Sequence, residues 1–264
     1  MTPTAHWEWR MSKAFIAGLA MGGALLVAVS VGAYRTGQES AEEQAFRKES
    51  LDATPILHDV LTEKQRIHSK LYPEYQLKRA GQGTIDDLIA KNPDKKVLGT
   101  SVCPGLGPAF LEPETPENYF GNLADSADAI ILGTVKRKAS QVTEDRAFIF
   151  TDYDVSVTQV FKNNPSAPIS VGARVTVTRQ GGKVLLRGVV MRAIDSNVEP
   201  LSVNTRVVLF LTFIKETGAY QAAKAEGSFE LDGSSVRPLT AGRLPPGVLG
   251  DADDFLQTLA SISK

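Results

Sequence analysis

The chain has 264 residues, of which 42% are hydrophobic, and 29 Lys and Arg residues nearly balance 30 Asp and Glu residues. This length and composition are typical of a globular protein of one or two domains and exclude a largely disordered chain. The near-neutral charge gives no support for nucleic-acid binding, and the single cysteine excludes an internal disulfide.

An uncharged apolar segment of 21 residues lies near the N-terminus, at residues 14–34 (AFIAGLAMGGALLVAVSVGAY). As a helix it would extend about 31 Å, which matches the hydrocarbon core of a bilayer. Trp7 and Trp9 precede it, as interfacial anchors often do. A signal peptide is the alternative, because residues 31–33 (VGA) offer a cleavage site before Tyr34. We favour an uncleaved anchor, since the run is longer than the roughly 7–15 residues of a signal-peptide core.

The segment before the apolar run, residues 1–13, is a short N-terminal tail that carries Arg10 and Lys13. A short basic tail of this kind behaves like the start of an export signal, so we expect the N-terminus to lie inside the cell. The sequence thus predicts a single-pass membrane protein whose C-terminal part is extracytoplasmic; cleavage would instead release a secreted or periplasmic protein. Gly18 and Gly22 form a GxxxG pattern, which would let two such helices pair in a homo-oligomer.

Residues 35–120 are predicted to form a helical stalk and a linker rich in Pro and Gly. Residues 38–53 are polar and favour a helix, and a second helix is expected from Thr54, as N-cap, to Pro73. Its apolar stripe would consist of Ile56, Leu57, Val60, Leu61, Ile67 and Leu71. Residues 84–87 (TIDD) have the form of a capping box at the start of a short helix. The Pro- and Gly-rich residues 92–118 predict an extended linker.

The pattern changes to β-strands in residues 121–240. Residues 146–161 (RAFIFTDYDVSVTQVF) alternate, and as one flat strand they would extend about 53 Å, so we expect a bend with a bulge near Thr151–Asp152. Gly181-Gly182 predicts the tight turn of a hairpin. Residues 204–213 (NTRVVLFLTF) are apolar on both faces and need a second cover. A helix within residues 241–264 would supply it, through Phe255, Leu259 and Ile262.

Several short strands with tight turns and no βαβ rhythm predict a mainly β fold, a small antiparallel β-barrel at residues 121–240. The N-terminal transmembrane helix and the stalk would precede the barrel, and the helix of residues 241–264 would pack on it.

A resemblance extends this prediction. The segments ADAIILGTV, TDYDVSVTQVFK, VTVTRQGG, RVVLFLTF and GAY together resemble a barrel domain of many uncharacterised exported bacterial proteins. That domain is distantly similar to the netrin-like, OB-type barrels of secreted inhibitor proteins. The resemblance covers about residues 124–240, and it implies the barrel fold. It does not imply inhibition, because the disulfide-tethered N-terminus of the inhibitors is absent here.

Residues that could carry chemistry are scarce. Residues 121–240 contain no His and no Cys, which excludes a Ser-His-Asp or Cys-His site, or a His- or Cys-ligated zinc, built within that segment. Asp152 and Asp154 share a strand face and are weak candidates for metal binding or acid–base chemistry; we interpret them as a solvated face. Gly181-Gly182-Lys183 lacks the rest of a phosphate-loop motif.

The remaining candidates lie in the predicted stalk. Cys103 is expected to be a buried, inert thiol, with pairing between two chains as the alternative. His58 and His68 would not share a helix face for a metal, and we expect them to be solvated or packed.

With no catalytic set, the sequence favours a non-enzymatic binding or assembly module without a cofactor. The alternatives are a metal-binding protein or hydrolase that uses only Asp and Glu, and a structural stalk that oligomerises. The expected partners are the bilayer, through residues 14–34, and a protein partner or a second copy of the chain, but no nucleic acid.

The anchor interpretation predicts that the mature protein keeps residues 1–34. Intact-mass analysis of protein isolated from its native membranes is expected to find Tyr34 still joined to the leader, because the whole apolar run would be needed to span the bilayer. A mature chain that begins at Tyr34 would contradict the anchor and favour the signal peptide.

Overall fold

The computed structural model describes residues 40–56, 60–72, 83–102, 115–195, 198–223, 227–240 and 250–262. By its internal contacts the chain divides into two compact units, residues 1–45 and residues 46–264. The predicted membrane segment 14–34 lies outside the described residues, as do His58 and Cys103. Within the described ranges, no helix is long and apolar enough to cross a bilayer.

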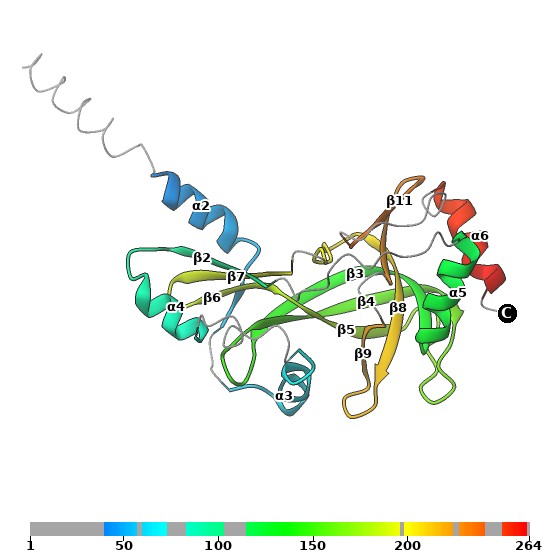
Figure 1. The fold of residues 1–264 in the computed structure, drawn as a ribbon, viewed down its shortest axis with the longest axis horizontal. Coiled ribbons are helices and arrows are strands. Elements are labelled where there is room, and N and C mark those ends of the chain that lie inside the picture. Colours follow the sequence, from blue (N-terminus) through cyan, green and yellow to red (C-terminus); the bar gives the residue numbers. More distant parts are fainter. Residues whose placement is uncertain are drawn as a thin grey trace, which may run out of the picture. The chain divides into compact units, whose positions relative to one another are not determined.

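The second unit is built of two β-sheets and short helices (Figure 1). The first, here called the small sheet, has four strands in the order β1 (Thr54–Pro55), β6 (Gly182–Leu186), β7 (Val189–Asp195) and β2 (Val97–Val102). β6 and β7 form an antiparallel hairpin, β1 runs parallel to β6, and β2 runs parallel to β7. The outer strands of this sheet therefore come from the N-terminal half of the chain.

The second sheet, here called the large sheet, has seven strands. Their order is β11 (Ser235–Pro238), β10 (Ser228–Asp232), β8 (Arg206–Ile214), β3 (Ala129–Val142), β4 (Ile149–Lys162), β5 (Arg174–Gln180) and β9 (Ala219–Ala222). β9 pairs with β5 and also with β8, so β8, β3, β4, β5 and β9 pair in a ring. The two sheets confirm the predicted mainly β class.

β8 is buried on both faces, as the sequence predicts. Val207, Leu209 and Leu211 face the core that β4 and β5 line, whereas Val208 and Phe210 face two helices. These are α5 (Pro116–Ser126) and α6 (Ala252–Ile262), which lie side by side over the sheet (Figure 1).

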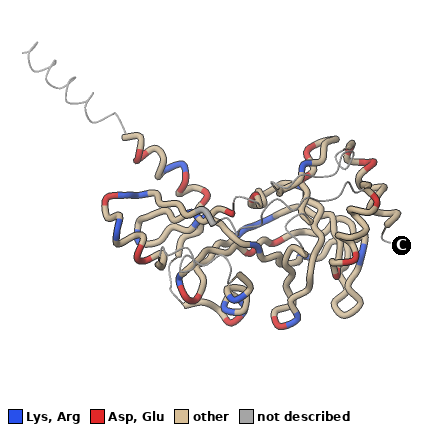
Figure 2. Tube along the Cα trace, in the orientation of Figure 1, with Lys and Arg blue, Asp and Glu red and all other residues tan. Residues whose placement is uncertain are grey.

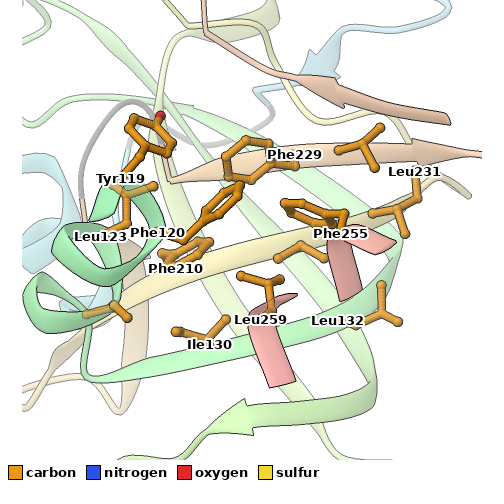
Figure 3. Close-up of a cluster of buried hydrophobic side chains, with 14 of the residues drawn as sticks. Tyr119, Phe120, Leu123, Ile130, Leu132, Phe210, Phe229, Leu231, Phe255 and Leu259 are labelled. Atoms are coloured by element: carbon orange, nitrogen blue, oxygen red, sulfur yellow. The ribbon is translucent and has the colours of Figure 1, made fainter. Parts of the chain in front are cut away.

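The contact between these helices and the large sheet is a cluster of buried hydrophobic side chains, which includes several aromatic rings (Figure 3). The Phe120 ring centroid on α5 lies 5.3 Å from that of Phe255 on α6 and 5.9 Å from that of Phe229 on β10. Edge-on pairs at this spacing add to the stabilisation from burial. The C-terminal helix thus packs on the sheet as predicted, but it supplies only part of the cover, because α5, which begins near the end of the segment predicted to be linker, covers the same face.

The long strands of the large sheet show the predicted period of two. In β4, Tyr153, Val155 and Val157 are buried while Asp152 and Asp154 are partly exposed. The predicted bulge near Thr151–Asp152 is wrong, because β3 and β4 stay in register there. The register shifts instead lie between Ile130 and Ile131, between Leu132 and Gly133, and between Val135 and Arg137.

Two of the predicted N-terminal helices are confirmed. α2 (Ala41–Ser50) has acidic residues in its first turn and basic residues in its last, an order that the helix dipole favours. α4 (Ile85–Lys91) begins with the predicted capping box: the Thr84 hydroxyl accepts from the Asp87 backbone N–H, and the Asp87 carboxylate accepts from that of Thr84.

The helix predicted from Thr54 to Pro73 is wrong. Thr54–Pro55 form β1, and the backbone N–H of Ile56 donates to the carbonyl of Leu185 on β6 at 3.0 Å. The described helix in this segment, α3 (Glu63–Ser69), starts later, with Thr62 as its N-cap. Pairing with a strand far along the chain has overridden the local helical periodicity.

The linker predicted at residues 92–118 also differs from the structure. Residues 97–102 form β2 in the small sheet, and residues 116–118, at the end of the predicted linker, begin α5. Thr115 caps α5, and Pro116 occupies the first helical position, where a missing N–H costs nothing. The prolines that indicated a linker therefore serve in part to start a helix.

Gly181-Gly182 is not the turn of a hairpin, contrary to the prediction. β5 ends at Gln180 in the large sheet, and β6 begins at Gly182 in the small sheet, so the chain changes sheets here. The hairpin turn is Arg187-Gly188, where both φ angles are positive, at 51° and 78°. At Gly182, with φ 139°, a Cβ would lie 2.6 Å from the Ser140 hydroxyl oxygen and closer still to that of Thr151.

This close approach predicts that Gly182→Ala destabilises the protein more than Gly172→Ala. Gly172 also has a positive φ, 86°, but a Cβ there would meet no atom within 4 Å, so its substitution measures backbone strain alone. We expect Gly182→Ala to lower the free energy of unfolding by about 1–3 kcal/mol more, because of overpacking. Chemical denaturation of both variants is the measurement, and equal losses would contradict the close approach.

Candidate functional site

His68 is the histidine that the structure describes, and it is fully buried between α3 and the large sheet. Its Nδ1 lies 2.8 Å from an Asp152 carboxylate oxygen, and its Nε2 lies 3.0 Å from the Thr217 hydroxyl. An ionised carboxylate can only accept, so Nδ1 is the donor to Asp152. Lys64 on α3 also donates to the Thr176 hydroxyl on β5, at 3.1 Å. These contacts fasten α3 to the sheet.

Thr217, His68 and Asp152 are linked by hydrogen bonds in the same order as the nucleophile, general base and acid of a catalytic triad. This result refines the sequence argument, which excluded such a set only if every member came from residues 121–240. Thr217 lies in the β8–β9 turn, where its hydroxyl also accepts from the Ala219 N–H and the nearby Gly218 N–H donates to Ile214. Because these backbone N–H groups already donate hydrogen bonds within the turn, they are not available to form an oxyanion hole. We interpret the three residues as a clamp.

Asp152 and Asp154, the weak metal candidates, take separate basic partners. Asp152 contacts the buried His68, while Asp154 accepts from Nε of the exposed Arg137 at 3.0 Å. Among the residues that the structure describes, no group of three His, Cys, Asp or Glu side chains is placed to hold a metal ion. The two carboxylates thus share a face, as predicted, without sharing a partner.

A second cluster of polar side chains ties Glu49 and Asp52 to both sheets. Lys183 on β6 lies 2.8 Å from a Glu49 oxygen and 3.2 Å from an Asp52 oxygen, and Lys138 on β3 also binds Asp52. The hydrogen bond from Lys183 lowers the pKa of Glu49 from its ordinary value. Lys183, weighed in the sequence as part of a phosphate loop, is therefore engaged by carboxylates.

Arg179 on β5 is buried, with 2% of its surface exposed. Among the described residues, neither terminal nitrogen of its guanidinium has a hydrogen-bond partner. Burial lowers its pKa from the ordinary value, although the nearby Tyr153 and Tyr72 oppose this effect. Burying charged nitrogens without hydrogen bonds costs free energy of folding.

The candidate site is a hollow of about 410 Å³ where the small sheet, α3, α4 and the β3–β4 turn meet. This volume is within the range of about 300–1,000 Å³ that is usual for small-molecule sites. Its lining comprises Ile56, Val60, Leu61, Arg66, Asp86, Gln141, Val142, Thr143, Glu144, Arg146 and Arg187. It therefore has an apolar wall as well as charged groups of both signs.

Ion pairs between neighbouring elements hold the charged wall of the hollow. Asp86, in the first turn of α4, binds Arg146 from the β3–β4 turn through two nitrogens. The same carboxylate lies 3.1 Å from Arg187 of the β6–β7 turn. Across the hollow, Nε of Arg66 on α3 lies 3.1 Å from Glu144. A planar guanidinium that is held by a carboxylate keeps a fixed orientation, so this wall is preorganised.

Sequence reasoning missed these residues. The capping box of α4 was found, but it gave no reason to single out Asp86 inside it. Arg146 and Arg187 both have positive φ, 56° and 51°, so each lies in a turn. Of these two turns, only the Arg187-Gly188 turn had a signal in the sequence, the glycine at position 188. No local sequence pattern indicates that the β3–β4 turn and the β6–β7 turn lie next to each other.

Basic and acidic residues are interspersed over the described elements, in keeping with the near-neutral composition (Figure 2). The chain matches no protein-family model, and a comparison with curated proteins finds no similar chain.

The clamp predicts strong coupling between His68 and Asp152. In a double-mutant cycle with His68→Ala and Asp152→Ala, we expect a coupling energy of about 1.5–3 kcal/mol, because the hydrogen bond is buried and involves a charge. The matched cycle, Arg137→Ala with Asp154→Ala, tests a more exposed ion pair between β3 and β4 and should give about 0.2–1 kcal/mol. Equal coupling in the two cycles, measured by chemical denaturation, would contradict the clamp.

Proposed function

We propose that the chain is a membrane-anchored protein that presents its β domain outside the cytoplasm as a non-enzymatic binding module. The observation that carries the binding function is the hollow of about 410 Å³, whose lining combines apolar side chains with fixed guanidinium groups. Such a combination is typical of sites that bind a small molecule through burial and a few oriented polar contacts.

The fold proposed for this module is a small barrel of the OB or netrin-like type, as the resemblance over residues 124–240 implies. The ring of pairing among β8, β3, β4, β5 and β9 supports it, because an OB-type barrel is a small five-stranded one. The placement of the apolar segment 14–34 in a bilayer is likewise part of the proposal and is supported by its length and lack of charge.

The contacts favour binding over the alternative of Asp- and Glu-based chemistry. Asp152 belongs to the clamp with His68, and Asp154 is paired with Arg137, so the two carboxylates that sequence reasoning singled out are engaged separately. In the hollow, Asp86 is likewise committed to Arg146 and Arg187. A carboxylate that is held between two guanidinium groups is better suited to orienting them than to acting as a base.

The test is to fill the hollow. Gln141 lines it from β3, and Gln141→Trp would place a large ring where the ligand is proposed to lie. Full-length protein purified from its native membranes in a mild detergent is expected to release a bound small molecule on denaturation, detected by mass spectrometry. The Gln141→Trp variant should release much less of it, because the ring removes the space.

Gln159→Trp provides the matched control, since Gln159 is exposed on β4 outside the lining of the hollow. This variant should release as much bound molecule as the wild type. If the wild type releases no molecule, or if Gln141→Trp releases the wild-type amount, the proposed function is wrong.

A further inference from the structure

We propose that the hollow binds a small organic carboxylate, that is, a molecule with one negative charge next to an apolar group. This inference deepens the binding function proposed above and rests on it. It follows from the charge of the lining, from the donors that Arg187 retains, and from the apolar wall beside it.

The lining carries an excess of one positive charge. Arg66, Arg146 and Arg187 contribute three positive charges, and Asp86 and Glu144 contribute two negative ones. A ligand with a single negative charge would neutralise this excess, whereas a dianionic phosphate would leave an unbalanced negative charge. Because charges in a partly enclosed site are screened less than on an open surface, this excess favours an anion over a neutral ligand, although Glu63, outside the lining, also pairs with Arg66.

Arg187 retains donors for such a ligand. An arginine has five N–H donors, and among the described residues the partner of the Arg187 guanidinium is a single oxygen of Asp86, at 3.1 Å. Its side chain is also 59% exposed, so the remaining N–H groups can be reached from solvent. Guanidinium and carboxylate groups pair through two parallel hydrogen bonds, which makes an arginine of this kind a suitable carboxylate receptor.

Asp86 fixes where that receptor points. The capping box at Thr84 sets the start of α4, and the Asp86 carboxylate then contacts both Arg146 and Arg187. Side chains that are held before binding lose less conformational entropy when the ligand arrives. Asp86 thus acts as a positioning residue for Arg187.

The apolar wall of the hollow accounts for the second part of the ligand. Ile56, Leu61 and Val142 are partly or fully buried there, and Val60 next to them is 82% exposed. Covering an exposed aliphatic side chain is favourable, by about 25 cal/mol per Å² of apolar surface removed from water. An apolar group attached to the carboxylate would cover Val60 while the carboxylate binds Arg187.

The test is calorimetric titration of the full-length protein in a non-ionic detergent with four probes: hexanoate, acetate, hexan-1-ol and hexyl phosphate. Hexanoate has both features of the proposed ligand, and acetate and hexan-1-ol have one each. We expect hexanoate to bind about tenfold or more tightly than any of the other three, which corresponds to one charge-assisted contact or the burial of a short chain.

Two substitutions assign the binding to this site. Arg187→Gln should weaken hexanoate binding about tenfold, while Arg174→Gln, at an exposed arginine on β5, should leave it unchanged. Val60→Ser should weaken hexanoate but not acetate, and Val171→Ser, at another exposed valine, should change neither. Thermal unfolding of each variant checks that the fold is retained, which is expected because Arg187 and Val60 are both largely exposed.

Four results would overturn the inference. If hexan-1-ol binds as tightly as hexanoate, or if the Arg187→Gln variant keeps wild-type affinity, the ligand need not carry a carboxylate. If hexyl phosphate binds more tightly than hexanoate, the site prefers a dianionic group over a carboxylate. If no probe binds, the inference also falls. The binding function is decided separately, by the molecule that the wild type releases and Gln141→Trp does not.

Discussion

At Gly182 the chain leaves the large sheet so close to the hydroxyl groups of Ser140 and Thr151 that no side chain fits between them. Those two hydroxyls are 2.8 Å apart, and the one on Thr151 donates to the carbonyl of Gly181, so the crossing point is itself hydrogen-bonded. Because β6 turns away from β5 here, its edges are open to β7 and to β1. The small sheet, and with it the hollow beneath the β6–β7 turn, depends on this change of direction.

The hollow shows how contacts between distant segments can form a site without any local motif. Its three arginines come from α3, the β3–β4 turn and the β6–β7 turn, and its two carboxylates come from α4 and the β3–β4 turn. Each arginine contacts a carboxylate of another element or turn, so the ion pairs fasten the helices to the sheets and at the same time orient the groups that face the hollow. Stability and recognition thus rely on the same side chains.

Features that short-range physics decides were predicted from the sequence, and features set by distant partners were not. The period of two in β4, the capping box at Thr84 and the burial of β8 on both faces follow from the residues themselves. Thr54–Pro55 formed a strand because β6 offers an edge for pairing, which no local pattern discloses. The sequence could not reveal the contact of His68 with Asp152, because nothing in either segment indicates that α3 packs on β4. Gly181-Gly182 was misjudged because paired glycines serve a close approach as well as a tight turn.

The position of β1 and β2 on either side of the β6–β7 hairpin has a consequence for synthesis. β1 and β2 leave the ribosome well before β6 and β7, with which they pair in parallel. Until then the backbone groups and apolar side chains of these early strands, such as Leu98, have no native partner, and such species are prone to aggregate. β1 and β2 are therefore the parts of the nascent chain that a holding chaperone would have to shelter.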